Sequence, residues 1–448
     1  MSRFYPFAHR RLIVALLLVA LVGLVGGLSI SFAQEESPLA TEMDPTPLVE
    51  WMTLLYDRIE VERISAPAAS RMYAYAGVTA YEAVVNGIPG NYSIGGQVQG
   101  MNDLPLPEEG QVYDWASVAN AALARVIEGL FPNPSQETLD AIQELYLSQA
   151  EARTKEVGAS VVRRSLDYGD MLAEELNAWI AGDNFAETRT MEYTLPTGEG
   201  MWVPTTEGTN PAEPYWGQIR PFALGYADEC AVNMNIDYST DENSAFYAQA
   251  MEVKEVGENL TPEQQAIARW WVDTPAVSGT PAGHWVSIEN QMVEHLDLPL
   301  SRAAEMYALV GMALGDAFIS CWSLKYQYNL LRPETYIHDN IRRSWQPYIQ
   351  TPPFPEYPSG HSVVSAAAAE VLTTMFGIVA FTDNTHVDEG EAPRSFTSFE
   401  AASTEAAISR LYGGIHFRTA IENGMRQGRC VGQRVLGYIS LRPVPQGE

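Results

Sequence analysis

The segment "PFPEYPSGHSVVSAAAAEVLTTMF", residues 353–376, leads from a proline-rich approach directly into an apolar, alanine-rich run. Serine is a common N-cap residue, so Ser359 predicts a helix that begins near His361 and ends near Phe376. The free N–H groups at such a helix start favour anions, and Gly360 lets an anion approach the backbone closely. His361 would then face the anion and could exchange a proton with it. The simpler alternative is a capped helix whose histidine has no role.

Helical periodicity recurs through most of the chain, whereas the alternating pattern of β-strands is rare. A segment rich in Pro, Gly and Trp over residues 197–224 predicts one long loop among the helices. We therefore predict an all-α fold of two packed helix bundles with long loops. The predicted helices span residues 47–64, 68–85, 112–129, 136–149, 155–180, 241–254, 262–271, 284–295, 301–331, 361–376, 398–412 and 416–438.

The N-terminus has the form of a secretory signal. Three arginines precede an uncharged apolar run, and Ser31-Phe32-Ala33 then offers small residues at the usual cleavage spacing. We predict a signal peptide over residues 1–33, with an uncleaved anchor as the alternative, and a secreted, periplasmic or extracellular protein. The remainder is predicted to divide into a flexible segment (34–45), an N-terminal helical region (46–300) and a C-terminal bundle that carries the motifs (301–440).

Acidic residues dominate the composition, with 56 Asp and Glu against 27 Lys and Arg and a formal net charge of −29. Such a surface repels nucleic acid and anionic lipid, so we expect no nucleic acid as a partner, and no membrane once the signal is removed. Cys230, Cys321 and Cys430 are too few and too far apart for a disulfide framework. They allow one disulfide bond, whose pairing the sequence leaves open.

Two cations lie seven residues apart in "KYQYNLLRP", Lys325 and Arg332. Seven residues are about two helical turns, so both side chains would lie on one helix face and could hold an anion between them. Pro333 predicts that this helix ends at Arg332. Two independent surface cations are the alternative.

A third motif, "ISRLYGGIHFRTA", contains Arg410 and His416. On a continuous helix these side chains would point in different directions. Gly413-Gly414 predicts a break between two helices, and the resulting bend would let both side chains reach one place. A buried structural histidine is the alternative.

Together the motifs supply three cations, two imidazoles and neutral donors, which suits an oxyanion held from all sides. Written as Lys-x6-Arg-Pro, Pro-Ser-Gly-His and Ser-Arg-x3-Gly-x-His, they resemble the signature of the type 2 phosphatidic acid phosphatase and vanadium-dependent haloperoxidase superfamily. The likeness runs from Asp316 to about Gly424. Upstream, "SRMYAYAGVTAYEAV", "IRPFAL" and "TPAGHW" resemble the exported haloperoxidase branch, whose folds are all-α with two helix bundles.

The resemblance implies a role for each motif residue. His416 would be the axial ligand of vanadium, His361 the acid–base residue, and Lys325 would polarise the bound peroxide. The vanadate or phosphate oxygens would be held by Lys325, Arg332, Ser359, Gly360 and Arg410. Trp322 and Phe354 fall where fungal chloroperoxidases have a Trp and a Phe beside the halide. Phosphatase relatives hold phosphate in the same pocket, with the residue at His416 as nucleophile.

One departure bears on the reaction. Many phosphatases of the superfamily have an Asp four residues after the second histidine, where this chain has Ala420. An imidazole without an acceptor on its other nitrogen is a poorer nucleophile, although a carboxylate elsewhere, such as Asp316 or Glu405, could replace that Asp.

We therefore predict a vanadate-dependent haloperoxidase that oxidises halide with hydrogen peroxide and acts on a small organic acceptor. An exported acid phosphatase that works through a phosphohistidine is the first alternative, and a non-catalytic oxyanion-binding protein is the second. The preferred halide stays open. Outside the motifs, His284 is expected to be structural beside Trp285, and His338 and His386 are expected at the surface.

Overall fold

The computed structural model describes residues 37–443 of the 448-residue chain. The predicted signal peptide, and with it the choice between cleavage and anchoring, lies outside these residues. Residues 37–108 and 113–443 form one compact unit, and its predominance of helices confirms the predicted all-α class. Its helices are η1 (Ala40–Glu42), α2 (Thr46–Val61), α3 (Ala66–Val84), η2 (Val85–Gly87), α4 (Trp115–Leu130), α5 (Gln136–Val157), α6 (Ala159–Ala181), α7 (Phe185–Thr188), η3 (Trp216–Gln218), α8 (Ala245–Glu258), α9 (Pro262–Trp270), α10 (Thr280–His295), α11 (Leu300–Tyr328), α12 (Pro333–Asn340), α13 (Gly360–Phe376), α14 (Phe399–Tyr412) and α15 (Arg418–Tyr438).

Side-chain caps fix where several of these helices begin. Ser135 accepts a hydrogen bond from the N–H of Thr138 at the start of α5, and Asp114 does the same for α4. At α9, Thr261 and Gln264 form a reciprocal capping box. Each cap satisfies backbone donors that the first helical turn leaves without a partner, which is worth about 1 kcal/mol per cap.

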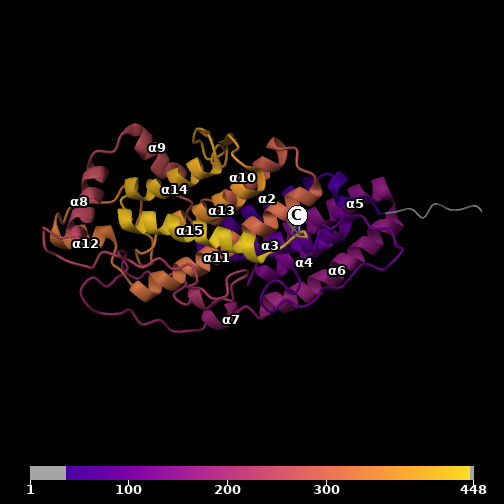
Figure 1. The fold of residues 1–448 in the computed structure, drawn as a ribbon, viewed down its shortest axis with the longest axis horizontal. Helices are drawn as coiled ribbons and strands as arrows, with labels where there is room; N and C mark the ends of the chain where they lie inside the picture. The colour runs from indigo at the N-terminus through magenta and orange to yellow at the C-terminus, as the bar shows by residue number, and fades with distance from the viewer. Residues whose placement is uncertain (1–36, 444–448) are drawn as a thin grey trace, which may run out of the picture. The chain divides into compact units, whose positions relative to one another are not determined.

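Helix α11 joins two groups of helices (Figure 1). On one side it packs along α3, which packs against α4, and α4 packs against α6. On the other side it packs against α13 and α15, and α14 packs against α13. These are the two packed bundles that the sequence predicts. The predicted boundary near residue 300 stays a prediction, because α11 contributes to both groups.

Glycines allow the closest helix contacts in each bundle. A Cβ on Gly77 of α3 would lie 2.1 Å from the carbonyl oxygen of Tyr307 in α11. A Cβ on Gly428 of α15 would lie 2.1 Å from the carbonyl oxygen of Val363 in α13. Among the described residues, α11 is the one helix long and apolar enough to cross a membrane, but the surrounding chain buries nearly all of its apolar stretch. Helix α11 is therefore the core helix that both bundles share.

The chain between Lys325 and Pro333 differs from the prediction of one helix to residue 331. Helix α11 ends at Tyr328, where Asn329 adopts a left-handed conformation with φ of 46°. Leu330 then pairs with Met201 in an isolated β-bridge, so Arg332 and Lys325 do not share a helix face. Pro333 begins α12 instead of only ending α11, because proline is well suited to the first helical turn.

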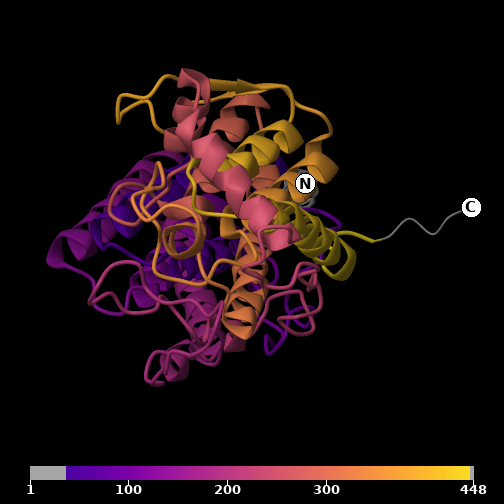
Figure 2. The ribbon, with the colours of Figure 1, turned by 90° about the vertical axis from the view of Figure 1, so that its left-hand side faces the viewer.

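The sequence also did not predict the ribbon of β1 (Phe381–Asp383) and β2 (Arg394–Phe396), which pair in antiparallel register. These strands contact α10 and α14, and Figure 2 shows them at the top of the view. A disulfide bond joins Cys230 to Cys430, and Cys321 is a buried free thiol. The bond ties the loop that follows residue 224 to α15, the helix that follows His416.

Candidate active site

The three sequence motifs meet around the side chain of His416. Nη1 of Arg332 lies 3.2 Å from Nε2 of His416. The charges of Lys325 and Arg410, and the ring of His361, also act on this imidazole. The five side chains come from the last turn of α11 (Lys325), the residue before α12 (Arg332), the first turn of α13 (His361), the last turn of α14 (Arg410) and the turn before α15 (His416).

The predicted break at Gly413-Gly414 is what allows Arg410 and His416 to approach one another. Helix α14 ends at Tyr412, and Gly414 adopts a φ of +79°, which strongly favours glycine. A Cβ at Gly414 would also approach Pro347 to within 3.1 Å. The break therefore has both a conformational and a packing cause.

His416 is held in one tautomer by its two neighbours. Its Nδ1 lies 2.9 Å from Oε1 of Glu356, which also accepts a hydrogen bond from the N–H of Phe417. Arg332 can only donate, so Nε2 of His416 must be the acceptor and Nδ1 must carry the proton. Burial, followed by the nearby charges of Arg332 and Lys325, lowers the pKa of His416 well below its usual range. The ring is thus neutral, with the lone pair of Nε2 directed into the cluster of cations.

The ammonium of Lys325 is buried and anchors the proline-rich approach to α13. Burial, together with the neighbouring charge of Arg332, lowers the pKa of Lys325 to about 7. A buried cation whose acceptors are neutral would gain from a nearby anion. The ammonium donates hydrogen bonds to three backbone carbonyls, those of Pro355, Glu356 and Pro358.

The two arginines are buried and only partly engaged by the protein. Nε of Arg332 donates to the carbonyl of Phe354, and Nη1 donates to that of Ile415. Nη2 of Arg332 is buried without a hydrogen-bond partner in the described part of the chain. Arg410 donates to the hydroxyl of Ser409. Burial lowers the pKa of each guanidinium to about 10.

The start of α13 brings Ser359 and Gly360 to the same place. Ser359 is the residue before the helix, as predicted, but its hydroxyl accepts from the hydroxyl of Ser362 and does not cap the helix N–H groups. The first N–H groups of α13 are therefore left for another acceptor. A Cβ on Gly360 would lie 3.4 Å from the ring of Trp322, so the residue also allows close packing.

His361 lies at the edge of the cluster, with its side chain 15% exposed. A hydrogen bond to the backbone of Trp271 holds the ring, while Nε2 has no hydrogen-bond partner among residues 37–443. Nε2 lies 3.8 Å from Oδ2 of Asp273. Burial and the charge of Arg410 lower the pKa of His361 well below its usual range, against a smaller effect of Asp273. The ring is therefore a neutral proton acceptor.

Two aromatic rings close one side of the cluster. The centroids of Trp322 and Phe354 lie 4.9 Å apart, and Nε1 of Trp322 donates to the carbonyl of Ala212 in the long loop. The ring of Phe354 lies 4.7 Å from the guanidinium carbon of Arg332 and 5.0 Å from the ammonium of Lys325. The pair forms an apolar wall next to two cations.

Sequence reasoning missed the carboxylate that orients His416. Glu356 lies within the quoted segment, yet nothing in its spacing singles it out. Asp316 and Glu405, the two candidates named from sequence, have other partners. The carboxylate of Asp316 accepts hydrogen bonds from the backbone of the "IRPFAL" loop at Phe222, Ala223 and Leu224. Glu405 accepts from Nε1 of Trp271 and pairs with Arg394. The premise that His416 lacks an orienting acceptor is therefore wrong.

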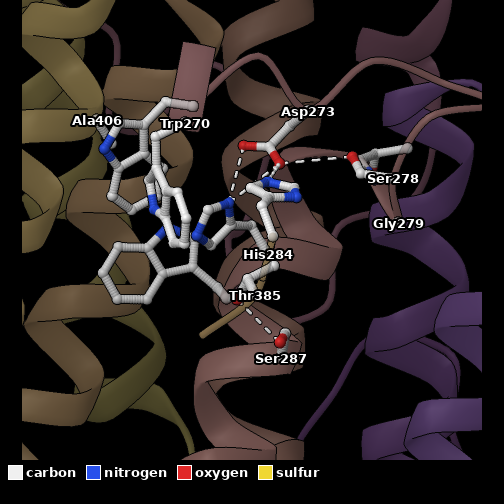
Figure 3. A network of polar contacts seen from close by, with 12 residues as sticks. Trp270, Asp273, Ser278, Gly279, His284, Ser287, Thr385 and Ala406 are labelled. Atoms are coloured by element: carbon white, nitrogen blue, oxygen red, sulfur yellow. Dashed lines mark hydrogen bonds and ion pairs between the residues drawn. The ribbon is translucent and has the colours of Figure 1, made fainter. Parts of the chain in front are cut away.

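A second cluster of imidazoles and carboxylates surrounds Asp273 and His284 (Figure 3). His284 stacks on Trp271 with ring centroids 4.2 Å apart, and not on Trp285. Its Nδ1 lies 3.0 Å from Oδ1 of Asp273, and its Nε2 lies 2.8 Å from Oδ2 of Asp383. His386, expected at the surface, is buried, and its Nε2 lies 3.1 Å from Oδ1 of Asp273.

Comparison with known proteins assigns the family. The family model described as VCPO second helical-bundle domain matches residues 305–441. The crystal structure of the first bacterial vanadium-dependent iodoperoxidase is 36% identical in sequence and superposes with a TM-score of 0.84 over 92% of this chain and 100% of that one. The chain belongs to the vanadium haloperoxidase family. No curated protein matches the sequence.

Other vanadium haloperoxidases share the fold at lower identity. The apo-type bacterial vanadium-dependent chloroperoxidase is 13% identical, with a TM-score of 0.62 over 84% of this chain and 94% of that one. The holo-type chloroperoxidase is 15% identical, with a TM-score of 0.61 over 91% and 96%. At this identity the likeness concerns the fold alone. The all-α architecture is thus that of the vanadium haloperoxidases.

Proposed function

We propose that the protein is a vanadate-dependent haloperoxidase that oxidises iodide with hydrogen peroxide. The environment of His416 carries the proposal, because a neutral imidazole nitrogen faces a cluster of cations while Glu356 engages the other nitrogen. Metal-binding histidines are commonly oriented by a carboxylate in this way. Membership of the family and the 36% identity to an iodoperoxidase support the same function.

The donors present fit vanadate. Nη2 of Arg332 and Nε2 of His361 are buried polar atoms without hydrogen-bond partners in residues 37–443. Three buried cations with lowered pKa values would be stabilised by an oxyanion. We therefore propose that vanadium binds Nε2 of His416, and that its oxygens are held by Lys325, Arg332, Arg410, Ser359 and Gly360.

Bound vanadate would supply a Lewis acid that polarises the oxygens of hydrogen peroxide. The protein's own contribution is charge and proton transfer. A neutral His361 accepts a proton from the incoming peroxide and returns one when the oxidised halide leaves. Lys325 would hold the bound oxyanion through its ammonium, whose charge would stabilise the negative charge that develops during halide attack.

The aromatic wall can accept a large, weakly hydrated halide, but fungal chloroperoxidases are expected to have the same two rings, so the preference for iodide rests mainly on the 36% identity to an iodoperoxidase. Burying an anion costs most for a small, strongly hydrated ion, so chloride would lose more hydration energy than iodide on reaching Trp322 and Phe354. The indole N–H of Trp322 is already donated to Ala212, so it does not compensate that loss. Iodide is therefore the proposed substrate. The oxidised iodine species would react with a small organic acceptor.

Phosphoester hydrolysis is the second candidate, because Glu356 gives His416 the orientation that a nucleophilic imidazole needs. The same pocket would hold phosphate in place of vanadate. The phosphatase and the haloperoxidase predict opposite results in assays of phosphoester hydrolysis and halide oxidation.

We also propose that the protein is exported. The disulfide between Cys230 and Cys430 supports an oxidising compartment, in line with the arginine-led apolar N-terminus. The acidic surface supports a protein that binds neither nucleic acid nor anionic lipid.

The test uses purified protein stripped of vanadate and then titrated with orthovanadate. Iodide, bromide and chloride oxidation by hydrogen peroxide are measured next to hydrolysis of p-nitrophenyl phosphate. Oxidation that requires vanadate, is suppressed by phosphate and falls in the order iodide, bromide, chloride supports the proposal. Ester hydrolysis without halide oxidation selects the phosphatase, and inactivity in both assays selects an oxyanion-binding protein. A higher rate for chloride than for iodide contradicts the halide assignment alone.

A further inference from the structure

Asp273 lies between His361 and the second histidine cluster. One carboxylate oxygen, Oδ2, is 3.8 Å from Nε2 of His361, and the other, Oδ1, is 3.1 Å from Nε2 of His386. Figure 3 shows the carboxylate of Asp273 reaching toward His284, with Ser278 on its other side. The carboxylate therefore connects the proposed acid–base residue to a histidine outside the vanadate pocket.

His284 fixes Asp273 but does not carry protons itself. Both of its ring nitrogens face carboxylates, so both carry a proton and neither offers a lone pair to a metal or to a moving proton. The opposite carboxylate, Asp383, also accepts from Nε1 of Trp270 and from Thr385. The two carboxylates raise the pKa of His284 to about 10, against the opposing effect of burial, so the ring stays charged near neutral pH.

His386 has a different environment. Its Nε2 faces the buried Asp273, whereas its Nδ1 lies 3.7 Å from Oε2 of Glu389, whose side chain is 40% exposed. The other charged groups near it are the ring of His284, 5.0 Å away between centroids, and Glu60 of α2. Burial and the charge of Glu389 raise the pKa of Glu60, so two acidic groups lie at the outer end of the cluster.

We propose that His386 and Asp273 conduct protons between Glu389 at the surface and His361. The proposal rests on the proposed function, because oxidation of a halide by hydrogen peroxide consumes one proton for each hypohalous acid and water formed. A path through the protein would deliver this proton without passing the apolar wall of Trp322 and Phe354.

Each transfer in the path balances. Glu389 or solvent donates a proton to Nδ1 of His386, and the Nε2–H bond of the resulting imidazolium breaks as an O–H bond forms on Oδ1 of Asp273. The protonated carboxyl is short-lived because, against the effect of burial, His284 and His386 hold the pKa of Asp273 well below its usual range. The carboxyl group then turns so that this hydrogen faces His361, and the O–H bond breaks as an N–H bond forms on Nε2 of His361, which a small rotation of the imidazole ring brings closer than the present 3.8 Å. Rotation of the His386 ring returns a proton-bearing nitrogen to Asp273.

The test compares three variants of the vanadate-loaded enzyme with the wild type. His386→Gln keeps a hydrogen-bonding group at the position but cannot take up a proton, and Glu389→Gln changes an exposed side chain. His295→Gln is the control, because His295 is exposed at the end of α10, away from the path. The turnover number for iodide oxidation is measured from acid to alkaline pH in dilute buffer and again with added imidazole. Vanadate affinity is measured for each variant.

We expect His386→Gln to lower turnover in dilute buffer by about tenfold or more, and imidazole to restore most of it. Glu389→Gln should show a smaller loss that is also restored, while vanadate affinity and the control stay unchanged. Turnover of His386→Gln equal to that of the wild type overturns the proton path alone. A loss that imidazole does not restore, or a stoichiometric metal ion bound at His386, overturns it as well. A wild-type protein that oxidises no halide overturns the proposed function, and the path with it.

Discussion

The carboxylate of Glu356 and the imidazole of His416 form a buried pair, with Oε1 2.9 Å from Nδ1. Burial raises the pKa of Glu356 to about 7, although Lys325 and Arg332 oppose that change. The second oxygen, Oε2, is buried without a hydrogen-bond partner in the part of the chain that the structure describes. The carboxylate of Glu356 thus fixes the ring of His416, and its own pKa lies close to neutral pH.

Replacing Glu356 with glutamine tests this pair. The amide oxygen can still accept from Nδ1 of His416, but the negative charge that makes the ring more basic is lost. We expect Glu356→Gln to weaken orthovanadate binding by about tenfold. Equilibrium dialysis measures it, and Glu252→Gln, at a surface ion pair with Arg418, is the control. Unchanged affinity in Glu356→Gln would show that the negative charge of Glu356 is unimportant for vanadate binding.

The fold and the three motifs could be predicted because local patterns specify them. The helix start at residue 360, the break at Gly413-Gly414 and the long loop before residue 224 all follow from Ser, Gly and Pro at particular positions. The path from Lys325 to Arg332 was predicted wrongly. Its left-handed turn at Asn329 depends on pairing with Met201, which is distant in sequence.

The parts of the site that the sequence did not predict depend on contacts between segments that are distant in the chain. Glu356 contacts His416, although the two residues are 60 positions apart in the sequence. Asp273 and His386 are also in contact and are 113 positions apart. Neither acid belongs to a motif or to a helical period, so no spacing rule identifies it. The prediction that His386 lies at the surface is wrong. The short ribbon of β1 and β2, which brings its loop to the protein, leaves only a weak pattern in the sequence.

The two motif histidines should separate cofactor binding from turnover. His416→Ala removes the only proposed protein ligand of vanadium, so we expect stable vanadate binding to be lost. His361→Ala leaves the cations and His416 in place, so we expect vanadate to be retained while iodide oxidation falls by about 100-fold or more. Vanadium content after gel filtration and iodide oxidation by the same samples measure both effects. An active His361→Ala enzyme would remove His361 from the acid–base role.

The aromatic wall should control iodide use without controlling vanadate binding. Phe354→Ala would open the pocket beside Arg332 and Lys325 to water, so that iodide no longer gains from an apolar contact. We expect the KM for iodide to rise about tenfold, because iodide would lose its apolar contact with the ring of Phe354. Steady-state kinetics with iodide measure this, and orthovanadate affinity of the same variant is the internal control. An unchanged KM would mean that iodide binds elsewhere.

The disulfide between Cys230 and Cys430 should stabilise the C-terminal bundle. It closes a loop of 200 residues, and such cross-links restrict the unfolded chain. The double variant Cys230→Ser, Cys430→Ser should lower the free energy of unfolding by about 2–4 kcal/mol. Urea unfolding followed by circular dichroism measures the change. Cys321→Ser, at a buried thiol outside the bond, separates loss of the disulfide from loss of a buried sulfur.

Lys325 should make the stability of the vanadate-free protein depend on pH. Its pKa is lowered from 10.5 to about 7 in the folded protein. Between these values the unfolded chain binds a proton that the folded protein does not, so the free energy of unfolding must rise with pH from about 7 toward 10. One proton gives a slope of at most about 1.4 kcal/mol per pH unit.

Urea titrations of the vanadate-free wild type and of Lys325→Met across this range test the slope, which the variant should lose whatever its absolute stability. Orthovanadate should also flatten the slope in the wild type, because an anion beside the ammonium returns its pKa toward the unfolded value. Equal slopes in wild type and variant would show that Lys325 stays protonated in the empty pocket, and that its hydrogen bonds to three carbonyls outweigh the cost of burial.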